Sequence, residues 1–100
     1  MNQIVSENIS EIQQLFKHYG VQKAYLFGSA AGNEFSNNSD VDFLFSFPES
    51  FDYETYTENY FHLLEDLQNL LQRDVDLVAE KTLQNPYLIQ KINSQKIQLL

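Results

Sequence analysis

Residues 26–43 read LFGSAAGNEFSNNSDVDF, and this stretch decides the fold. Gly28-Ser29 ends one apolar run, and Asp40-Val41-Asp42 begins the next, with ten residues between Ser29 and Asp40. Apolar runs bounded by clusters of Gly, Ser and Asn are typical of strands joined by a loop. The stretch therefore predicts a tight turn, with its backbone amides available, facing a pair of carboxylates.

Beyond this stretch, apolar spacing predicts helices that alternate with strands. Pro48 ends the second strand, and Asn85 before Pro86 marks the start of the last helix. The predicted helices are 6–20 (Ser6 as N-cap, Gly20 as stop), 52–71 and 86–94; the strands are 21–27, 40–47, 74–79 and a short edge at 97–100; a helical turn at 29–31 precedes a loop at 32–39. This order predicts an α/β (α+β) fold in which a small mixed sheet is covered by helices, as one domain over residues 1–100.

Composition excludes several classes of protein. The chain has 100 residues, a net charge of −8 and no Cys. One Arg and five scattered Lys argue against direct binding of nucleic acid, which needs clustered cations. The absence of Cys suits a reducing compartment. The sequence shows neither a signal peptide nor an apolar run of the ~18 residues that a membrane helix needs, so we expect a cytoplasmic protein.

Asp40 and Asp42 are the first candidate site residues. Side chains two apart on a strand share a face, about 6.6–7 Å from each other, while Val41 and its apolar neighbours up to Phe47 turn to the buried face. Two carboxylates so placed suit two Mg²⁺ ions of the kind used in phosphoryl and nucleotidyl transfer. A neighbouring strand offers Asp74 and Asp76 as alternatives for a third carboxylate.

Gly28 and Ser29 complement the carboxylates. Glycine lets the backbone approach a ligand closely, and a turn that opens a helix directs N–H groups at phosphate oxygens. The Ser29 hydroxyl adds another hydrogen-bonding group. Phosphate-binding and metal-binding groups together predict a site for a nucleoside triphosphate.

These motifs resemble the minimal nucleotidyltransferase (MNT) family of the DNA polymerase β superfamily. Its signature is Gly-Ser, ten residues and Asp-x-Asp, which matches Gly28-Ser29 and Asp40-Val41-Asp42. The family's third carboxylate stands in a Val-Asp-Leu-Val context, which matches 75–78 and favours Asp76 over Asp74. The resemblance covers nearly the whole chain.

The resemblance implies transfer of AMP from Mg-ATP to a hydroxyl. Family members commonly act as antitoxins that modify a tyrosine of a HEPN-domain ribonuclease toxin, which implies a protein partner. The implied catalytic and metal-binding residues are Asp40, Asp42 and Asp76; the implied nucleotide-binding residues are Gly28 and Ser29, which bind the β and γ phosphates, and Ser39, which fixes the turn before Asp40.

Two alternatives stay open at the level of sequence. Many relatives carry an arginine where this chain has Gly32, and residues 24–72 hold no Lys or Arg. This departure favours a second hypothesis, a non-catalytic module that neutralises its partner by binding alone. Tyr53, Tyr56 and Tyr60 recur at helical spacing and are interpreted as packing residues, with a partner interface as the alternative.

Overall fold

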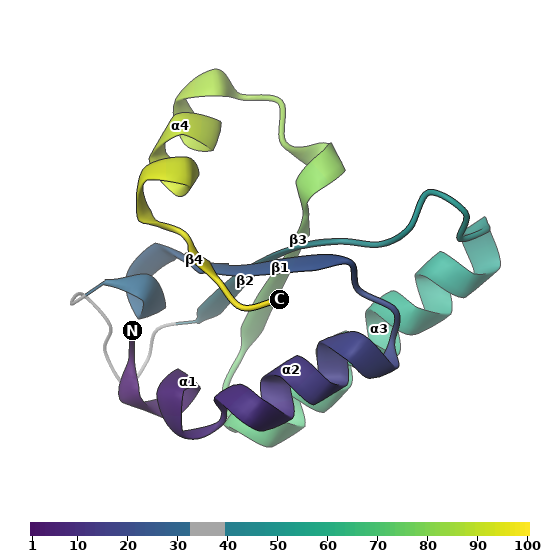
Figure 1. Cartoon of the computed structure of the whole chain (residues 1–100), viewed down its shortest axis with the longest axis horizontal. Coiled ribbons are helices and arrows are strands. Elements are labelled where there is room, and N and C mark those ends of the chain that lie inside the picture. The colour runs from purple at the N-terminus through teal and green to yellow at the C-terminus, as the bar shows by residue number, and fades with distance from the viewer. Residues whose placement is uncertain (33–39) are drawn as a thin grey trace.

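The computed structural model describes residues 1–32 and 40–100 and forms a mixed sheet with helices on both faces (Figure 1). The sheet has four strands in the order β3-β2-β1-β4. The elements are α1 (Gln3–Glu7), α2 (Ile9–His18), β1 (Lys23–Phe27), η1 (Gly28–Ala31), β2 (Val41–Ser46), α3 (Tyr53–Leu71), β3 (Val75–Ala79), η2 (Glu80–Thr82), α4 (Pro86–Gln95) and β4 (Ile97–Gln98). The predicted fold class is confirmed. The loop predicted at 32–39 falls almost entirely outside the described residues, and Ser39 lies there too.

The register of the strands sets which residues meet across the sheet. β1 pairs antiparallel with β2 and with the two-residue strand β4. β2 pairs parallel with β3, and α3 makes the crossover that a parallel pair requires. Phe27, Asp42 and Asp76 are thereby partners in one row across three strands.

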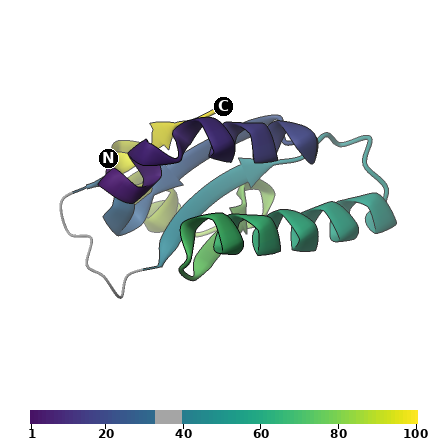
Figure 2. The same cartoon turned by 90° about the horizontal axis from the view of Figure 1, so that it is seen from below.

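One face of the sheet is apolar and packs on α2 and α3, which lie side by side beneath it (Figure 2). Val41, Phe43 and Phe45 are fully buried on this face, as predicted. The Phe43 ring lies 5.5 Å from Phe16 of α2, and the Phe45 ring lies 5.8 Å from Tyr60 of α3. This packing fixes the position of β2 in the molecule.

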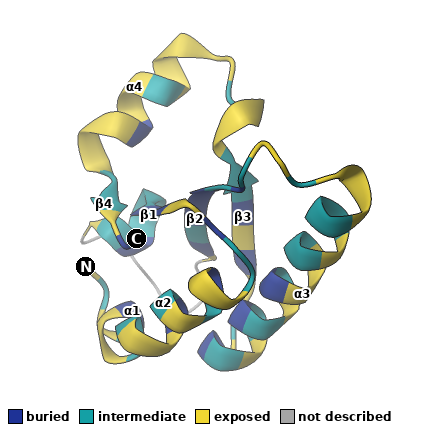
Figure 3. Cartoon of the chain, turned by 45° about the vertical axis from the view of Figure 1, so that its right-hand side comes forward, coloured by how far each residue is buried: buried dark blue, intermediate teal, exposed yellow. Residues whose placement is uncertain are grey.

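The other face is covered only in part, by α4. Leu44 on this face is 2 % exposed, and Ile92 of α4 is 3 % exposed. Both residues form part of the wall of a hollow between α4 and the sheet. Most of α4 is exposed to solvent (Figure 3). α4 therefore covers the middle of β2 on this face.

The first helix differs from its prediction. Ser6 lies inside α1 and is not an N-cap. The helix begins earlier because the Asn2 side chain accepts a hydrogen bond from the Ile4 N–H at 2.8 Å and Val5 becomes fully buried. A break at Asn8 separates α1 from α2. The predicted stop at Gly20 is confirmed, with a φ of 83° that favours glycine.

Side chains cap the starts of α3 and α4. Asp52 accepts a hydrogen bond from the Thr55 N–H at 2.7 Å at the start of α3. Asn85 does the same for Tyr87 at 2.9 Å, with proline next in the chain. The strands are shorter than predicted by one or two residues at some ends, and the turn η2 was not predicted. No helix among the described residues is both long and apolar enough to span a bilayer.

Candidate functional site

The predicted site residues that the structure describes gather at one corner of the sheet. Asp42 near the start of β2 and Asp76 near the start of β3 are direct partners in the parallel ladder. Neighbouring strands lie about 4.8 Å apart, so these two side chains stand next to each other on one face. Asp40 is exposed and immediately precedes β2. The structure therefore places three aspartates within reach of one another.

Gly28 closes the other side of this corner. It follows β1 directly and has a φ of 71°, a backbone conformation that disfavours other residues. A Cβ atom at Gly28 would lie 2.2 Å from Oδ2 of Asp42, which is shorter than any tolerable contact. Glycine is thus favoured here by the backbone conformation, and a larger residue would have to displace the Asp42 carboxylate.

Ser29 lies in the first turn of η1, as the predicted helical turn requires. The Ser29 carbonyl accepts a hydrogen bond from the Gly32 N–H at 3.2 Å. Ala30 is fully buried, and its carbonyl accepts a hydrogen bond from the Asn2 N–H at 2.9 Å. The N-terminus therefore supports this turn, a role for Asn2 that sequence reasoning missed because it depends on a contact distant in the chain.

The aspartates repel one another. Partial burial, followed by the charges of Asp76 and Asp40, raises the pKa of Asp42 from 3.8 to about 6. A bound cation would relieve this repulsion, and oxygen ligands are the ones that Mg²⁺ prefers. The donor set therefore fits a divalent cation.

Within residues 1–32 and 40–100, no group of three or more His, Asp or Glu side chains is arranged so that it could hold a metal ion by itself. Mg²⁺ rarely uses such a cage, since it commonly takes one or two carboxylates and completes its shell with water and substrate phosphates. The arrangement of Asp42 and Asp76 is compatible with that mode of binding.

Tyr60 borders the site from α3. Its hydroxyl donates a hydrogen bond of 2.7 Å to the carbonyl of Leu77, the residue after Asp76. Burial, and then the charge of Asp76, raises the pKa of Tyr60. Its helical spacing signalled packing alone, because the contact with β3 depends on the tertiary fold.

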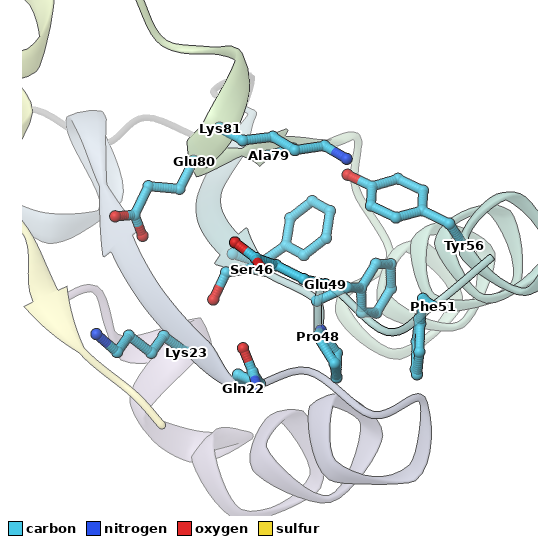
Figure 4. A pocket seen from close by; sticks show the side chains of 12 residues that line it. Gln22, Lys23, Ser46, Pro48, Glu49, Phe51, Tyr56, Ala79, Glu80 and Lys81 are labelled. Carbon is cyan, nitrogen blue, oxygen red and sulfur yellow. The ribbon is translucent and has the colours of Figure 1, made fainter. Parts of the chain in front are cut away.

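A separate cavity of about 430 Å³ lies at the opposite end of the strands (Figure 4). Lys23, Ser46 and Glu80 line it, and the Lys81 ammonium stands 4.2 Å from the centroid of the Tyr56 ring. Ser46 is four residues beyond Asp42 on β2, about 13 Å along the strand. This cavity is therefore distinct from the corner that holds the aspartates.

The family follows from comparison with known proteins. A family model described as "Polymerase beta, Nucleotidyltransferase" matches residues 10–100. The chain belongs to this nucleotidyltransferase family. Two Methanocaldococcus jannaschii proteins, both named as candidate protein adenylyltransferases, are 34 % and 36 % identical to it over 99 residues. Each alignment covers 91 % of this chain and 97 % of the relative.

Solved structures agree with the predicted family. A minimal nucleotidyltransferase matches with a TM-score of 0.79 and 26 % identity, over 97 % of this chain and 95 % of its own. A toxin–antitoxin structure with AMP-PNP matches with a TM-score of 0.73 and 28 % identity, over 93 % of this chain and 73 % of its own. A structure of an MNT antitoxin complexed with tri-AMPylated HEPN toxin of Shewanella oneidensis matches with a TM-score of 0.66 and 26 % identity, over 95 % of this chain and 71 % of its own. The resemblance read from the motifs is confirmed, and the chain is a nucleotidyltransferase with the MNT fold.

Proposed function

We propose that this nucleotidyltransferase transfers AMP from ATP to a tyrosine hydroxyl of a HEPN-domain toxin and so acts as an antitoxin in the cytoplasm, with residues 1–100 as one catalytic domain. The observation that carries the proposal is the direct pairing of Asp42 with Asp76 beside Gly28. Clustered carboxylates next to a glycine turn are what a metal-bound triphosphate needs.

Asp40 and Asp42 are the proposed ligands of two Mg²⁺ ions, and Asp76 completes the site beside the acceptor. When bound, Mg²⁺ supplies positive charge to the phosphate oxygens. Asp76 is favoured over Asp74 because its charge, with that of Asp40, acts on Asp42. The proposed site thus consists of Asp42 and Asp76, which are paired across β2 and β3, together with Asp40 just before β2.

Gly28 and Ser29 are the proposed partners of the β and γ phosphates, and Ser39 is the proposed support of the turn before Asp40. The acceptor oxygen forms a bond to the α-phosphorus, and the bond from that phosphorus to the β-phosphate oxygen breaks. Pyrophosphate leaves, and a carboxylate of the site accepts the hydroxyl proton. The residues therefore act by positioning the two reactants in line.

A protein acceptor is supported by two observations. The relatives are named as protein adenylyltransferases, and a similar solved structure pairs an MNT antitoxin with an AMPylated HEPN toxin. The net charge of −8 also argues against nucleic acid as the direct partner.

A second candidate function is neutralisation of the partner by binding alone. Gly32 favours it, because the resemblance leads us to expect an arginine there. A Cβ atom at Gly32 would meet nothing within 4 Å, so a side chain can begin at this position without a clash. The missing charge therefore reflects the sequence and not a steric limit of the turn.

One experiment separates the two candidates. The chain is incubated with Mg²⁺, ATP labelled at the α-phosphate and a HEPN-domain protein from the same genome. We expect label on a tyrosine of that protein, lost in Asp42→Ala and retained in Glu49→Ala, an exposed carboxylate at the opposite end of β2. Neutralisation of the toxin by Asp40→Ala and Asp42→Ala without any label would instead establish the binding module.

A further inference from the structure

A second feature lies along the outer edge of the sheet, between α3 and β3. A hollow of about 460 Å³ is lined mainly by aromatic and aliphatic side chains. We call it the aromatic groove; its principal residues are Tyr53, Tyr56, Tyr60, Phe61, Leu77 and Val78. Helix α3 forms one wall of the groove, and the edge strand β3 forms the other.

Two of its aromatic side chains project into solvent. Tyr53 is 87 % exposed and Phe61 is 58 % exposed. Exposed aromatic side chains next to a concave surface are enriched where proteins bind one another. Neither side chain belongs to the buried core, to which α3 contributes Leu63, Leu67 and Leu71.

Two carbonyl groups of the edge strand β3, beside the groove, already accept hydrogen bonds from side chains. Leu77 accepts from the Tyr60 hydroxyl at 2.7 Å, and Ala79 accepts from the Thr82 hydroxyl at 2.7 Å. An added strand would need these carbonyls as acceptors. An occupant of the groove would therefore make contact through side chains and not by extending the sheet.

The rim of the groove is acidic. Glu54 and Glu58 are exposed on α3, next in sequence to groove residues. Asp76 is exposed at the start of β3, and its charge acts on Tyr60. The cation Lys81 is directed at the Tyr56 ring, 4.2 Å from its centroid (Figure 4). Charge complementarity therefore calls for a partner with Lys or Arg around an apolar centre.

The groove also adjoins the proposed catalytic corner. Leu77, whose carbonyl Tyr60 holds, is the residue after Asp76 in the chain. A segment seated in the groove would thus lie one strand position from Asp76, at the edge of the sheet, with the carboxylate itself on the other face. Docking here would present a nearby hydroxyl to the nucleotide.

We propose that the aromatic groove docks a basic amphipathic helix of the acceptor protein, with apolar side chains on the aromatic surface and Lys or Arg facing the acidic rim. The assignment of this helix to the acceptor rests on the proposed function. A second copy of this chain is a poor occupant, because its own groove carries the same negative rim.

Fluorescence anisotropy tests the docking without any catalysis. The probe is a labelled helical peptide of Leu and Lys about four turns long, with a Leu and Glu peptide as its charge control. We expect saturable binding of the basic peptide alone. Tyr53→Ala with Phe61→Ala should weaken it about tenfold, a loss of about 1.4 kcal/mol. Tyr87→Ala, at an 82 % exposed tyrosine on α4, should leave it unchanged.

Three results would overturn the docking proposal: equal binding by wild type and the double variant, binding of the acidic peptide, or a dimer in sedimentation that the double variant abolishes. In label transfer to the HEPN protein, the double variant should raise the KM for the acceptor about tenfold at unchanged kcat. An absence of label transfer by the wild type would refute the proposed function and leave the peptide result standing.

Discussion

The two faces of the sheet place opposite chemistry on the same strand. Val41, Phe43 and Phe45 are fully buried against α2 and α3, whereas Asp42 between them is half-buried on the other face beside Asp76. Burial of aromatic side chains is strongly favourable, while the clustering of carboxylates is unfavourable without a cation. The apolar face therefore supplies the stability that holds the acidic face in a geometry that opposes folding.

The largest effect is expected on the apolar face. Phe43→Ala removes a fully buried ring that contacts Phe16, and it should lower the free energy of unfolding by about 3–5 kcal/mol. Phe61→Ala, at a ring 58 % exposed, is the matched control and should change it by less than about 0.5 kcal/mol. Urea denaturation measures both. Equal effects would remove the distinction between the faces.

On the acidic face, Asp76→Asn should abolish chemistry and not folding. We expect transfer of AMP to fall about 1000-fold, equivalent to about 4 kcal/mol, because the acceptor side of the proposed site loses its charge. Asp74 precedes β3, and Asp74→Asn should reduce the transfer of AMP by less than about threefold. Initial rates with labelled ATP decide the matter, and the reverse order would make Asp74 the third carboxylate.

Gly28→Ala tests how tightly the turn meets Asp42. The new Cβ atom would lie 2.2 Å from Oδ2 of Asp42, and φ is 71°. We expect transfer to fall about 100-fold, or about 2.7 kcal/mol, since the carboxylate must move. Gly32→Ala adds a methyl where nothing lies within 4 Å and should be neutral. A fully active Gly28→Ala would mean that the corner tolerates displacement of Asp42.

The expected effect of a charge at Gly32 is a gain. Gly32→Arg restores the positive charge expected from the family, at a position where a Cβ atom meets nothing within 4 Å. We expect the KM for ATP to fall about tenfold, with Gly32→Gln, which is long but neutral, unchanged. Steady-state kinetics at varied ATP measures both. Equal effects of Arg and Gln would show that charge at this position is irrelevant.

Sequence patterns were sufficient where a local rule determines the structure. The alternation of Val41 and Phe43 with Asp42 gave both faces of β2, and Asn85 caps the last helix as expected. The Gly28-Ser29 turn was likewise evident from its spacing to Asp40. In each case the deciding chemistry lies within a few residues.

Sequence patterns failed where distant contacts decide. Ser6 and Asn2 are both good N-caps, and the choice of Asn2 depends on burial of Val5 and on a hydrogen bond from Asn2 to Ala30. The position of Tyr60 beside β3 depends on tertiary packing in the same way. Helical spacing alone does not contain that information.

The loss of stability caused by the clustered aspartates depends on pH. The folded state raises the pKa of Asp42 from 3.8 to about 6, so between these values the folded protein binds more protons than the unfolded chain. The free energy of unfolding therefore decreases as pH rises from about 4 to 6. Water screens part of this half-exposed group, so we expect a loss of about 1 kcal/mol.

Thermal unfolding at pH 7 of wild type and Asp42→Asn, with and without Mg-ATP, tests whether the clustered aspartates destabilise the fold and bind the metal and nucleotide. We expect the variant to be the more stable protein without ligand, by about 1 kcal/mol, since its amide carries no charge. Mg-ATP should stabilise the wild type and leave the variant unchanged. A variant that is less stable without ligand, yet gains as much from Mg-ATP as the wild type, would show that Asp42 neither destabilises the fold nor binds the metal and nucleotide.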